Sequence, residues 1–357
     1  MEETRIYNDS RSVFIDILKV LSCLGVISIH YSAFYGTNLI CIFRPLVSFS
    51  VTCFMAVSGY LLFFRKQYNN GDIYKRILPK YIVMFLLWLI IYSYRGWNLS
   101  GRKEPLLLYF CENSEGGHLW YLKIYISLLI VYPIIRAITD SKKVCYFYAV
   151  MWLVFISVRY TLGWWLQIDN IYLRLIQMPF FQYSGFLGGT TKGYYPMECL
   201  GLFILGGGFI DTLKSIDFKW YKVIMGSGLF SLIFTVALTF IIYTGEAYQV
   251  DYTCDPFMTN VIVYSAGIIT LVFLVSRKHS YRVKRLFQVL STCTLGVYII
   301  HPLIASLVMK ILTGAVHVSD GWAYKICTYW GCTVLSFFIV LCLKKVIPNK
   351  IISYILG

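Results

Sequence analysis

Long apolar stretches, separated by short polar segments, recur along the whole chain. A helix of about 20 apolar residues crosses the hydrocarbon core of a bilayer. The pattern predicts membrane-spanning helices at residues 13–35, 43–64, 77–94, 118–138, 144–162, 194–211, 221–244, 257–276, 291–312 and 322–345. The connections leave no room for a separate soluble domain. We therefore expect an all-α integral membrane protein of about ten transmembrane helices, with residues 1–357 forming one polytopic domain.

Composition supports a membrane protein. Hydrophobic residues make up 58% of the 357 residues, charged residues only 14%, and the mean hydropathy is +0.67. These values exclude an ordinary soluble domain. The net charge of +15 does not indicate a nucleic-acid partner, because the basic residues lie between the apolar stretches. The polar start "MEETRIYNDSR" and the lack of a small-residue cleavage site predict that the first span is retained and is not a signal peptide.

Lysine and arginine concentrate in every second connection. Basic residues near a span mark its cytoplasmic end, so this asymmetry predicts that both termini are cytoplasmic. The loop "GEAYQVDYTCDP" on the opposite side has neither residue type. We expect a multi-pass protein of the cell inner (plasma) membrane. The residues assigned to the cytoplasmic side are Arg65, Lys66, Lys75, Arg76, Lys80, Lys142, Lys143, Lys214, Lys219, Arg277, Lys278, Arg282, Lys284, Arg285, Lys344, Lys345 and Lys350.

The eleven cysteines form no CxxC pair and no Cys/His cluster, so the sequence indicates no metal site. Cys41, Cys111 and Cys254 fall on the predicted outer side, where a disulfide among them stays open. The connection of residues 163–193 is long and aromatic. It is either a structural helix in the membrane interface or a lid over an outer site.

The first span, "DILKVLSCLGVISIH", carries an acid, a base and a histidine. Lys19 and His30 are 11 residues apart, which is about three helical turns, so both project from one side of the helix about 16 Å apart. Asp16 and Cys23 lie near the same line. Ionisable groups within a span usually mark a functional path, and histidine suits general base catalysis. In the alternative interpretation, Asp16 pairs with Lys19 and His30 bonds to a neighbouring helix.

Five segments together resemble the polytopic membrane acyltransferases of the acyltransferase-three type. They are "RSVFIDILKVLSCLGVISIH", "RPLVSFSVTCFMAVSGYLLF", "YKRILPKY", "HLWYLKIYISLLIVYP" and "STCTLGVYIIHPLI". The basic residue and histidine of the family's first-helix motif fall on Lys19 and His30. A glutamate that one large branch of the family places in the fourth span is missing from "YLKIY", so no residue here takes the role of that acid.

The resemblance implies that an acyl group, usually acetyl, passes from cytoplasmic acyl-CoA to a hydroxyl of an extracytoplasmic glycan or lipid-linked sugar. This is O-acetylation of the kind that modifies cell-envelope polysaccharides. Acetyl-CoA or another acyl-CoA is the expected co-substrate, with no metal. His30 is the expected general base, Lys19 the essential basic residue, and Asp16 is expected to hold Lys19 in place.

The other candidate residues divide between the two sides of the membrane. Lys75, Arg76 and Lys80 either hold coenzyme A phosphates or only satisfy the positive-inside rule, and Tyr81 is a candidate to cover the adenine. For Ser58 and Gly59, we favour a role in close helix packing over a role of the serine as a nucleophile. On the outer side, the acceptor candidates are Arg44, His118, Trp120, Glu198 and His301.

The outer candidates have structural alternatives. Arg44 can snorkel to the interface, and His301 can bond to a carbonyl that Pro302 leaves free. The tryptophans on the predicted outer side either contact a sugar or form an ordinary aromatic belt at the membrane interface. These are Trp97, Trp120, Trp164, Trp165 and Trp322.

Two other functions remain open at the level of sequence. The first alternative is a permease for a small polar solute such as the amino acid serine, which would pass along the polar residues of the first span. The fold resembles the membrane module that is joined to a racemase in some glycopeptide-resistance proteins. A chain ending in "IISYILG" is also consistent with an excised module of that kind. The second alternative is a non-catalytic membrane scaffold. The oligomeric state stays open between a monomer and a homodimer.

Overall fold

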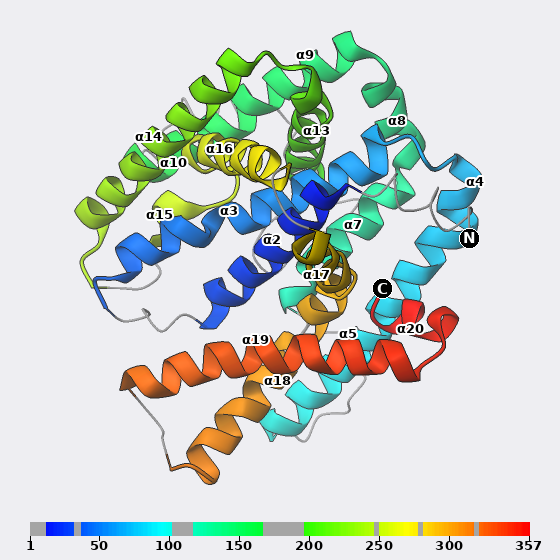
Figure 1. The fold of residues 1–357 in the computed structure, drawn as a ribbon, viewed down its shortest axis with the longest axis vertical. Coiled ribbons are helices and arrows are strands. Elements are labelled where there is room, and N and C mark those ends of the chain that lie inside the picture. The colour runs from blue at the N-terminus through cyan, green and yellow to red at the C-terminus, as the bar shows by residue number, and fades with distance from the viewer. Residues whose placement is uncertain are drawn as a thin grey trace.

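The computed structural model describes residues 12–31, 37–101, 117–166, 196–245, 250–277, 281–317 and 321–357. Within these ranges the chain folds into helices and contains no strand (Figure 1). The helices in order are α2 (Val13–Tyr31), α3 (Ile40–Gly59), η1 (Tyr60–Phe64), α4 (Asn70–Asp72), η2 (Ile73–Ile77), α5 (Leu78–Ser100), η3 (Gly117–Leu119), α7 (Trp120–Ile130), α8 (Tyr132–Asp140), α9 (Lys142–Trp152), η4 (Leu153–Val158), α10 (Arg159–Leu166), α13 (Pro196–Thr212), η5 (Leu213–Ser215), α14 (Phe218–Ile242), α15 (Asp251–Cys254), α16 (Thr259–Ser276), α17 (Tyr281–Ser291), α18 (Thr294–Gly314), α19 (Gly321–Val346) and α20 (Asn349–Ile355).

The prediction of an all-α multi-pass membrane fold is confirmed. In the described part of the chain, eight helices are long and apolar enough to cross a membrane, or nine if α7 and α8 form one bent span. The expected span at residues 194–211 corresponds to α13, which has only 17 residues. The difference from the expected ten spans therefore lies in α13 and in the bent pair.

Proline explains why the expected span at residues 118–138 is bent. Helices α7 and α8 meet at 74°, and Pro133 lies in the first turn of α8. Proline has no N–H to donate to the preceding turn, and its ring crowds the carbonyl four residues earlier. Before the break, Trp120–Ile130 packs against α5 and α13, and its Tyr121 reaches Phe54 and Ser58 of α3.

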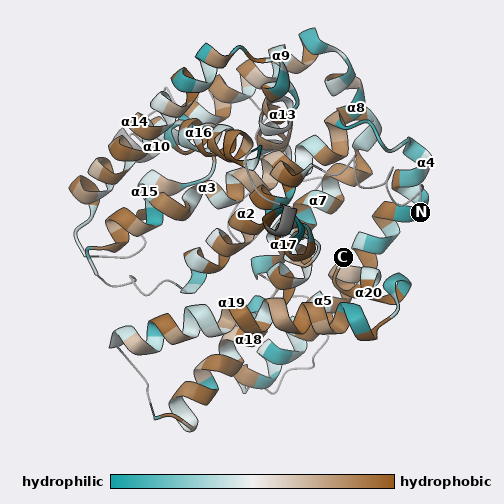
Figure 2. Ribbon diagram, in the orientation of Figure 1, coloured by the Kyte–Doolittle hydropathy of each residue, from teal (hydrophilic) through white to brown (hydrophobic). Residues whose placement is uncertain are grey.

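Helix α2 lies at the centre of the bundle (Figure 1). Of its apolar span, 67% is buried within the protein, compared with 22% for the peripheral α14. Exposed Leu229, Phe230 and Ile233 leave α14 strongly apolar on its outer surface (Figure 2). Because α2 is enclosed by other helices, its ionisable residues face protein, where charged groups within a span are usually found.

Glycine permits two close helix crossings. A Cβ at Gly228 of α14 would lie 2.8 Å from the Cα of Gly267 in α16, and a Cβ at Gly59 would lie 1.9 Å from the carbonyl oxygen of Phe203 in α13. Small residues let membrane helices approach to backbone contact. The packing interpretation of Gly59 is confirmed.

The connection of residues 163–193, predicted as an interfacial helix or a lid, lies outside the described residues from residue 167 onward. The side chains of Trp164 and Trp165 are also outside the described part. The prediction for this segment therefore stays a prediction.

Candidate active site

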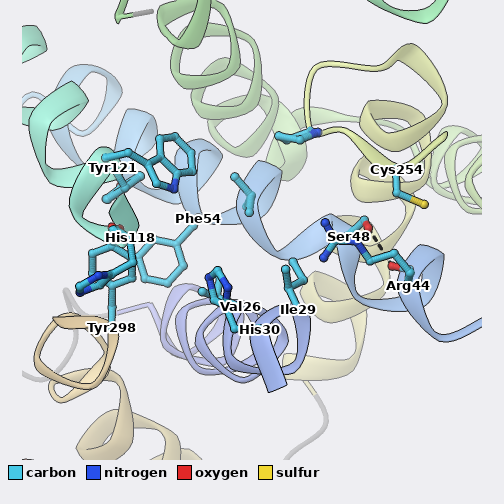
Figure 3. A pocket seen from close by; sticks show the side chains of 13 residues that line it. Val26, Ile29, His30, Arg44, Ser48, Phe54, His118, Tyr121, Cys254 and Tyr298 are labelled. Atoms are coloured by element: carbon cyan, nitrogen blue, oxygen red, sulfur yellow. Dashed lines mark hydrogen bonds between the residues drawn. The ribbon is translucent and has the colours of Figure 1, made fainter. Parts of the chain in front are cut away.

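Four helices of the bundle enclose a pocket around His30, which we call the His30 pocket (Figure 3). Side chains from α2, α3, α7 with its preceding turn η3, and α18 converge on it, and the segment around α15 closes one side. Its lining residues are Val26, Ile29, His30, Arg44, Ser48, Val51, Phe54, His118, Trp120, Tyr121, Cys254, Pro256 and Tyr298.

Helices α2, α3, α7 and α18, together with α5, α17 and α19, enclose a second pocket around Lys19, which we call the Lys19 pocket. Its lining residues are Lys19, Phe54, Ser58, Leu61, Tyr81, Tyr121, Leu122, Tyr125, Ser291, Thr292, Thr294, Leu295, Lys344 and Gly357. Lys19 and His30, which project from one side of α2, thus open into different pockets. The predicted topology directs the Lys19 pocket towards the cytoplasm and the His30 pocket towards the outside.

Phe54 and Tyr121 are the two described residues that line both pockets. On α3 and its continuation η1, one helical face carries the lining in order: Arg44, Ser48 and Val51 face the His30 pocket, Phe54 faces both, and Ser58 and Leu61 face the Lys19 pocket. Their spacing of three or four residues is that of one helix face. The two pockets therefore follow one another along one face of α3, with the rings of Phe54 and Tyr121 at their junction.

Three histidines gather at the His30 pocket. The ring of His301 stacks on that of His30 with 5.6 Å between centroids, and it meets His118 edge-on at 5.8 Å. These residues come from α18, α2 and η3. His30 is exposed to the pocket, whereas His301 is 1% exposed and lies behind it. Within the described residues, no group of three or more His, Cys, Asp or Glu side chains has the arrangement of a metal site.

His301 has the structural partner that Pro302 predicts. Proline has no N–H, so the carbonyl of Tyr298, four residues earlier, loses its helical donor. The Nδ1 of His301 lies 2.7 Å from that carbonyl oxygen. A carbonyl can only accept, so Nδ1 carries the hydrogen and, in the neutral ring, Nε2 holds the lone pair. His301 supports the ring of His30 and is not among the residues that line the pocket.

Arg44 brings a positive charge to the His30 pocket. Its guanidinium pairs with Asp251 of α15 at 2.5 Å, and its side chain is only 12% exposed. This ion pair ties the start of α3 to α15. Sequence reasoning missed Asp251 as its partner.

The cysteines near this pocket are free thiols. Cys41 and Cys254 are both unbridged, and Cys111 lies outside the described residues. Cys254 is the last residue of α15, and burial raises the pKa of its thiol to about 11. A thiol with that pKa stays protonated at neutral pH and is a poor nucleophile. Cys254 therefore contributes to the wall of the pocket.

The remaining outer candidates divide into two groups. His118 and Trp120 line the His30 pocket. Glu198 does not line it: it is buried at the start of α13, where its backbone carbonyl accepts a hydrogen bond from the indole of Trp152 at 2.7 Å. Trp97 packs beside Tyr94 at the end of α5, and Trp322 is exposed at the start of α19, so both fit an aromatic belt.

Of the residues expected to bind coenzyme A, some line the Lys19 pocket and others do not. Tyr81 lines the Lys19 pocket, and the ammonium of Lys80 lies 5.8 Å from the centre of its ring. Lys75 and Arg76 do not line the pocket; Arg76 is 81% exposed and lies 3.8 Å from Asp72. They lie on η2, immediately before the helix that carries Tyr81.

Lys344 is one of the site residues that the sequence did not single out. It lines the Lys19 pocket, and its ammonium donates hydrogen bonds to the carbonyl of Thr292 and, at 3.2 Å, to that of Gly357. In the sequence it appears as one more basic residue at the end of a span. Only the packing of α19 in the bundle brings it near Lys19.

Asp16 is 3% exposed and accepts a hydrogen bond from Ser291 of α17. Ser291 also lines the Lys19 pocket, so Asp16 anchors the wall of that pocket one turn before Lys19.

The family model of an acyltransferase domain, Acyl_transf_3, matches residues 12–349. This chain belongs to the acyltransferase-3 family. None of the curated proteins and none of the solved structures compared with it matches. The matched region contains every candidate residue of both pockets except Gly357.

Membership identifies the protein as a membrane acyltransferase, and the two pockets show where such chemistry has room. A transferase for two substrates must bring a donor and an acceptor together at one point. In this acyltransferase, Phe54 and Tyr121 mark the place where the two pockets meet. Sequence analysis did not single out either residue, although the regular spacing along α3 was a signal for Phe54.

Proposed function

We propose that this acyltransferase transfers an acetyl group from cytoplasmic acetyl-CoA to a hydroxyl of an extracytoplasmic glycan or lipid-linked sugar. The observation that carries the proposal is that Lys19 and His30, on one side of α2, open into two pockets that meet at Phe54 and Tyr121. A donor that enters one pocket and an acceptor that enters the other reach the same point. We place the protein in the inner membrane, with both termini in the cytoplasm.

The Lys19 pocket suits the donor. Its lining includes the ammonium groups of Lys19 and Lys344, and Lys80 lies beside Tyr81. Ammonium groups attract phosphates, and the Tyr81 ring offers a face for the adenine. Lys75 and Arg76 form an outer rim that would meet the coenzyme first. The pantetheine arm would then run along α2 towards Phe54 and Tyr121.

The His30 pocket suits the acceptor. His118, Trp120 and Arg44 provide hydrogen-bonding groups and an aromatic face, which are the groups that bind sugars. His30 removes the proton of the acceptor hydroxyl as its oxygen attacks the thioester carbonyl. The new C–O bond forms, the C–S bond breaks, and the proton passes from His30 to the departing CoA thiolate. The acyl group thus moves directly, and Asp16 keeps Lys19 in position.

The orientation of the two pockets is tested by labelling single cysteines. A cysteine at Asn69 should react with an impermeant maleimide only from the cytoplasmic side, and one at Gln249 only from outside. Gln249 lies outside the described residues but within the predicted outer loop. The unsubstituted protein gives the background from native cysteines. Labelling of both positions from one side would overturn the assignment of donor and acceptor sides.

Replacing Lys75 and Arg76 by Ala should raise KM for acetyl-CoA more than it lowers kcat. Both residues are exposed on η2, away from the reacting thioester, so their phosphate contacts would contribute uniform binding. Steady-state kinetics of CoA release would measure the two constants. Lys310→Ala, at the exposed far end of α18, is the matched control. An unchanged KM would leave Lys75 and Arg76 with a purely topological role.

Pockets that meet across the bundle also fit a permease, the second candidate. A permease carries its solute through the path between Phe54 and Tyr121 without breaking a covalent bond. Proteoliposomes separate the two functions: uptake of serine in the absence of coenzyme A supports a permease, whereas release of free CoA from acetyl-CoA supports the transferase.

A further inference from the structure

Phe54 and Tyr121 form the boundary between the two pockets, which we call the aromatic partition. Their rings meet edge to face, with centroids 5.6 Å apart and an interplanar angle of 75°. Both residues line both pockets. Figure 3 shows the two rings on the same side of the His30 pocket, near His118 and Tyr298. These two side chains therefore lie where the two pockets adjoin.

Tyr121 is held firmly. Its hydroxyl lies 2.5 Å from that of Ser58, its ring stacks on Phe203 at 6.2 Å, and Tyr298 meets it edge-on at 5.9 Å. A buried side chain with a satisfied hydroxyl and aromatic neighbours cannot move aside without losing these contacts. Tyr121 is therefore a fixed wall.

Phe54 faces this wall from α3. It is only partly buried, because both pockets expose its ring. Its neighbours on the same helix face, Val51 and Ser58, each line one pocket only. Because the Phe54 ring touches the Tyr121 wall, the space beside this contact depends on the size of the side chain at position 54.

We propose that the aromatic partition is the binding site for the acyl group and selects for short acyl chains. The inference rests on the proposed function, because it needs a thioester that arrives from the Lys19 pocket and is attacked from the His30 pocket. At that point the carbonyl carbon lies beside the edge where the two rings touch, and the alkyl part of the acyl group must fit against Phe54. An acetyl group needs space for one methyl; each added methylene must displace a ring whose partner is fixed.

Chain-length preference of the purified enzyme tests the partition. With acetyl-CoA, butyryl-CoA and hexanoyl-CoA as donors and isolated cell-envelope glycan as acceptor, the wild type should prefer acetyl, since one methylene in a shaped apolar pocket changes kcat/KM by roughly 10- to 200-fold. Phe54→Ala should reduce the acetyl/butyryl ratio of kcat/KM by about 10-fold or more. Phe54→Leu, which keeps more of the apolar volume, should give an intermediate ratio.

Two matched controls lie on the same face of α3 and η1. Val51→Ala enlarges the His30 pocket alone, and Leu61→Ala enlarges the Lys19 pocket alone. Both should keep the wild-type acetyl/butyryl ratio, even if they change its absolute rates. If either control relaxes the ratio as much as Phe54→Ala, or if Phe54→Ala keeps the wild-type ratio, the partition does not select the acyl chain.

The wild-type protein alone gives a second measurement that does not depend on how the variants fold. Non-hydrolysable thioether analogues of acetyl-, butyryl- and hexanoyl-CoA should bind progressively more weakly as the chain lengthens. Equal affinity for all three analogues would overturn the inference. If no acyl-CoA is consumed and no analogue binds, the proposed function fails; if acetyl is transferred without chain-length preference, only the inference about the partition fails.

Discussion

His30→Ala is expected to lower kcat for acetyl transfer by about 100-fold or more, the effect of removing a general base. The affinity for acetyl-CoA should stay close to that of the wild type, because His30 opens into the pocket opposite to the one that holds Lys19. The measurement is kcat from CoA release and Kd from calorimetry, both on folded, purified protein.

His317→Asn is the matched control for this prediction. His317 is exposed beyond α18 with φ of 56°, a backbone conformation that asparagine tolerates, and it should have wild-type kinetics. Full transfer by His30→Ala would remove the catalytic role of His30 and make the permease the better account. A loss of acetyl-CoA affinity equal to the loss of rate would instead place His30 in donor binding.

Lys19→Ala is expected to impair both acetyl-CoA binding and transfer, with kcat/KM lower by about 10- to 100-fold. The ammonium lines the proposed donor pocket, and its removal also takes away a cation three residues after buried Asp16 on the same helix. Truncating one member of a buried charged pair leaves the other unfavourably placed. Lys19→Arg keeps the charge and should retain appreciable activity. Kinetics and calorimetry on the two variants measure the contrast.

The Asp16 part of this prediction has its own test. If Asp16 holds Lys19, then the double variant Asp16→Asn, Lys19→Ala should lose less kcat/KM than the sum of the two single losses in free energy. Additive losses would show that Asp16 acts only through Ser291 and the wall of the pocket. Lys19→Ala with wild-type affinity for acetyl-CoA would contradict the donor assignment of that pocket.

The one-dimensional geometry of a helix explains what the sequence predicted well. Eleven residues make about three turns, so Lys19 and His30 had to share a side of α2 at different depths. The link between Pro302 and His301 was also predictable, because a missing N–H always frees the carbonyl four residues earlier. Both inferences need only local covalent geometry.

The residues that the sequence did not place correctly are those whose positions depend on how the helices pack together. Glu198 was expected near the acceptor, but it lies where α13 packs on Trp152, away from the His30 pocket. Lys344 and Tyr121 join the site only because α19 and α7 approach α2 and α3 in the folded bundle. The bend at Pro133 sets the course of α7, and the angle of such a bend depends on the surrounding helices.

The position of a bound donor shows whether the Lys19 pocket holds acetyl-CoA. We would determine the structure of the purified protein by electron cryomicroscopy with a saturating non-hydrolysable analogue of acetyl-CoA. We expect nucleotide density in the Lys19 pocket beside Tyr81 and Lys344, with the acyl end at Phe54 and Tyr121. Density for the nucleotide in the His30 pocket, or no bound analogue at saturation, would contradict this expectation.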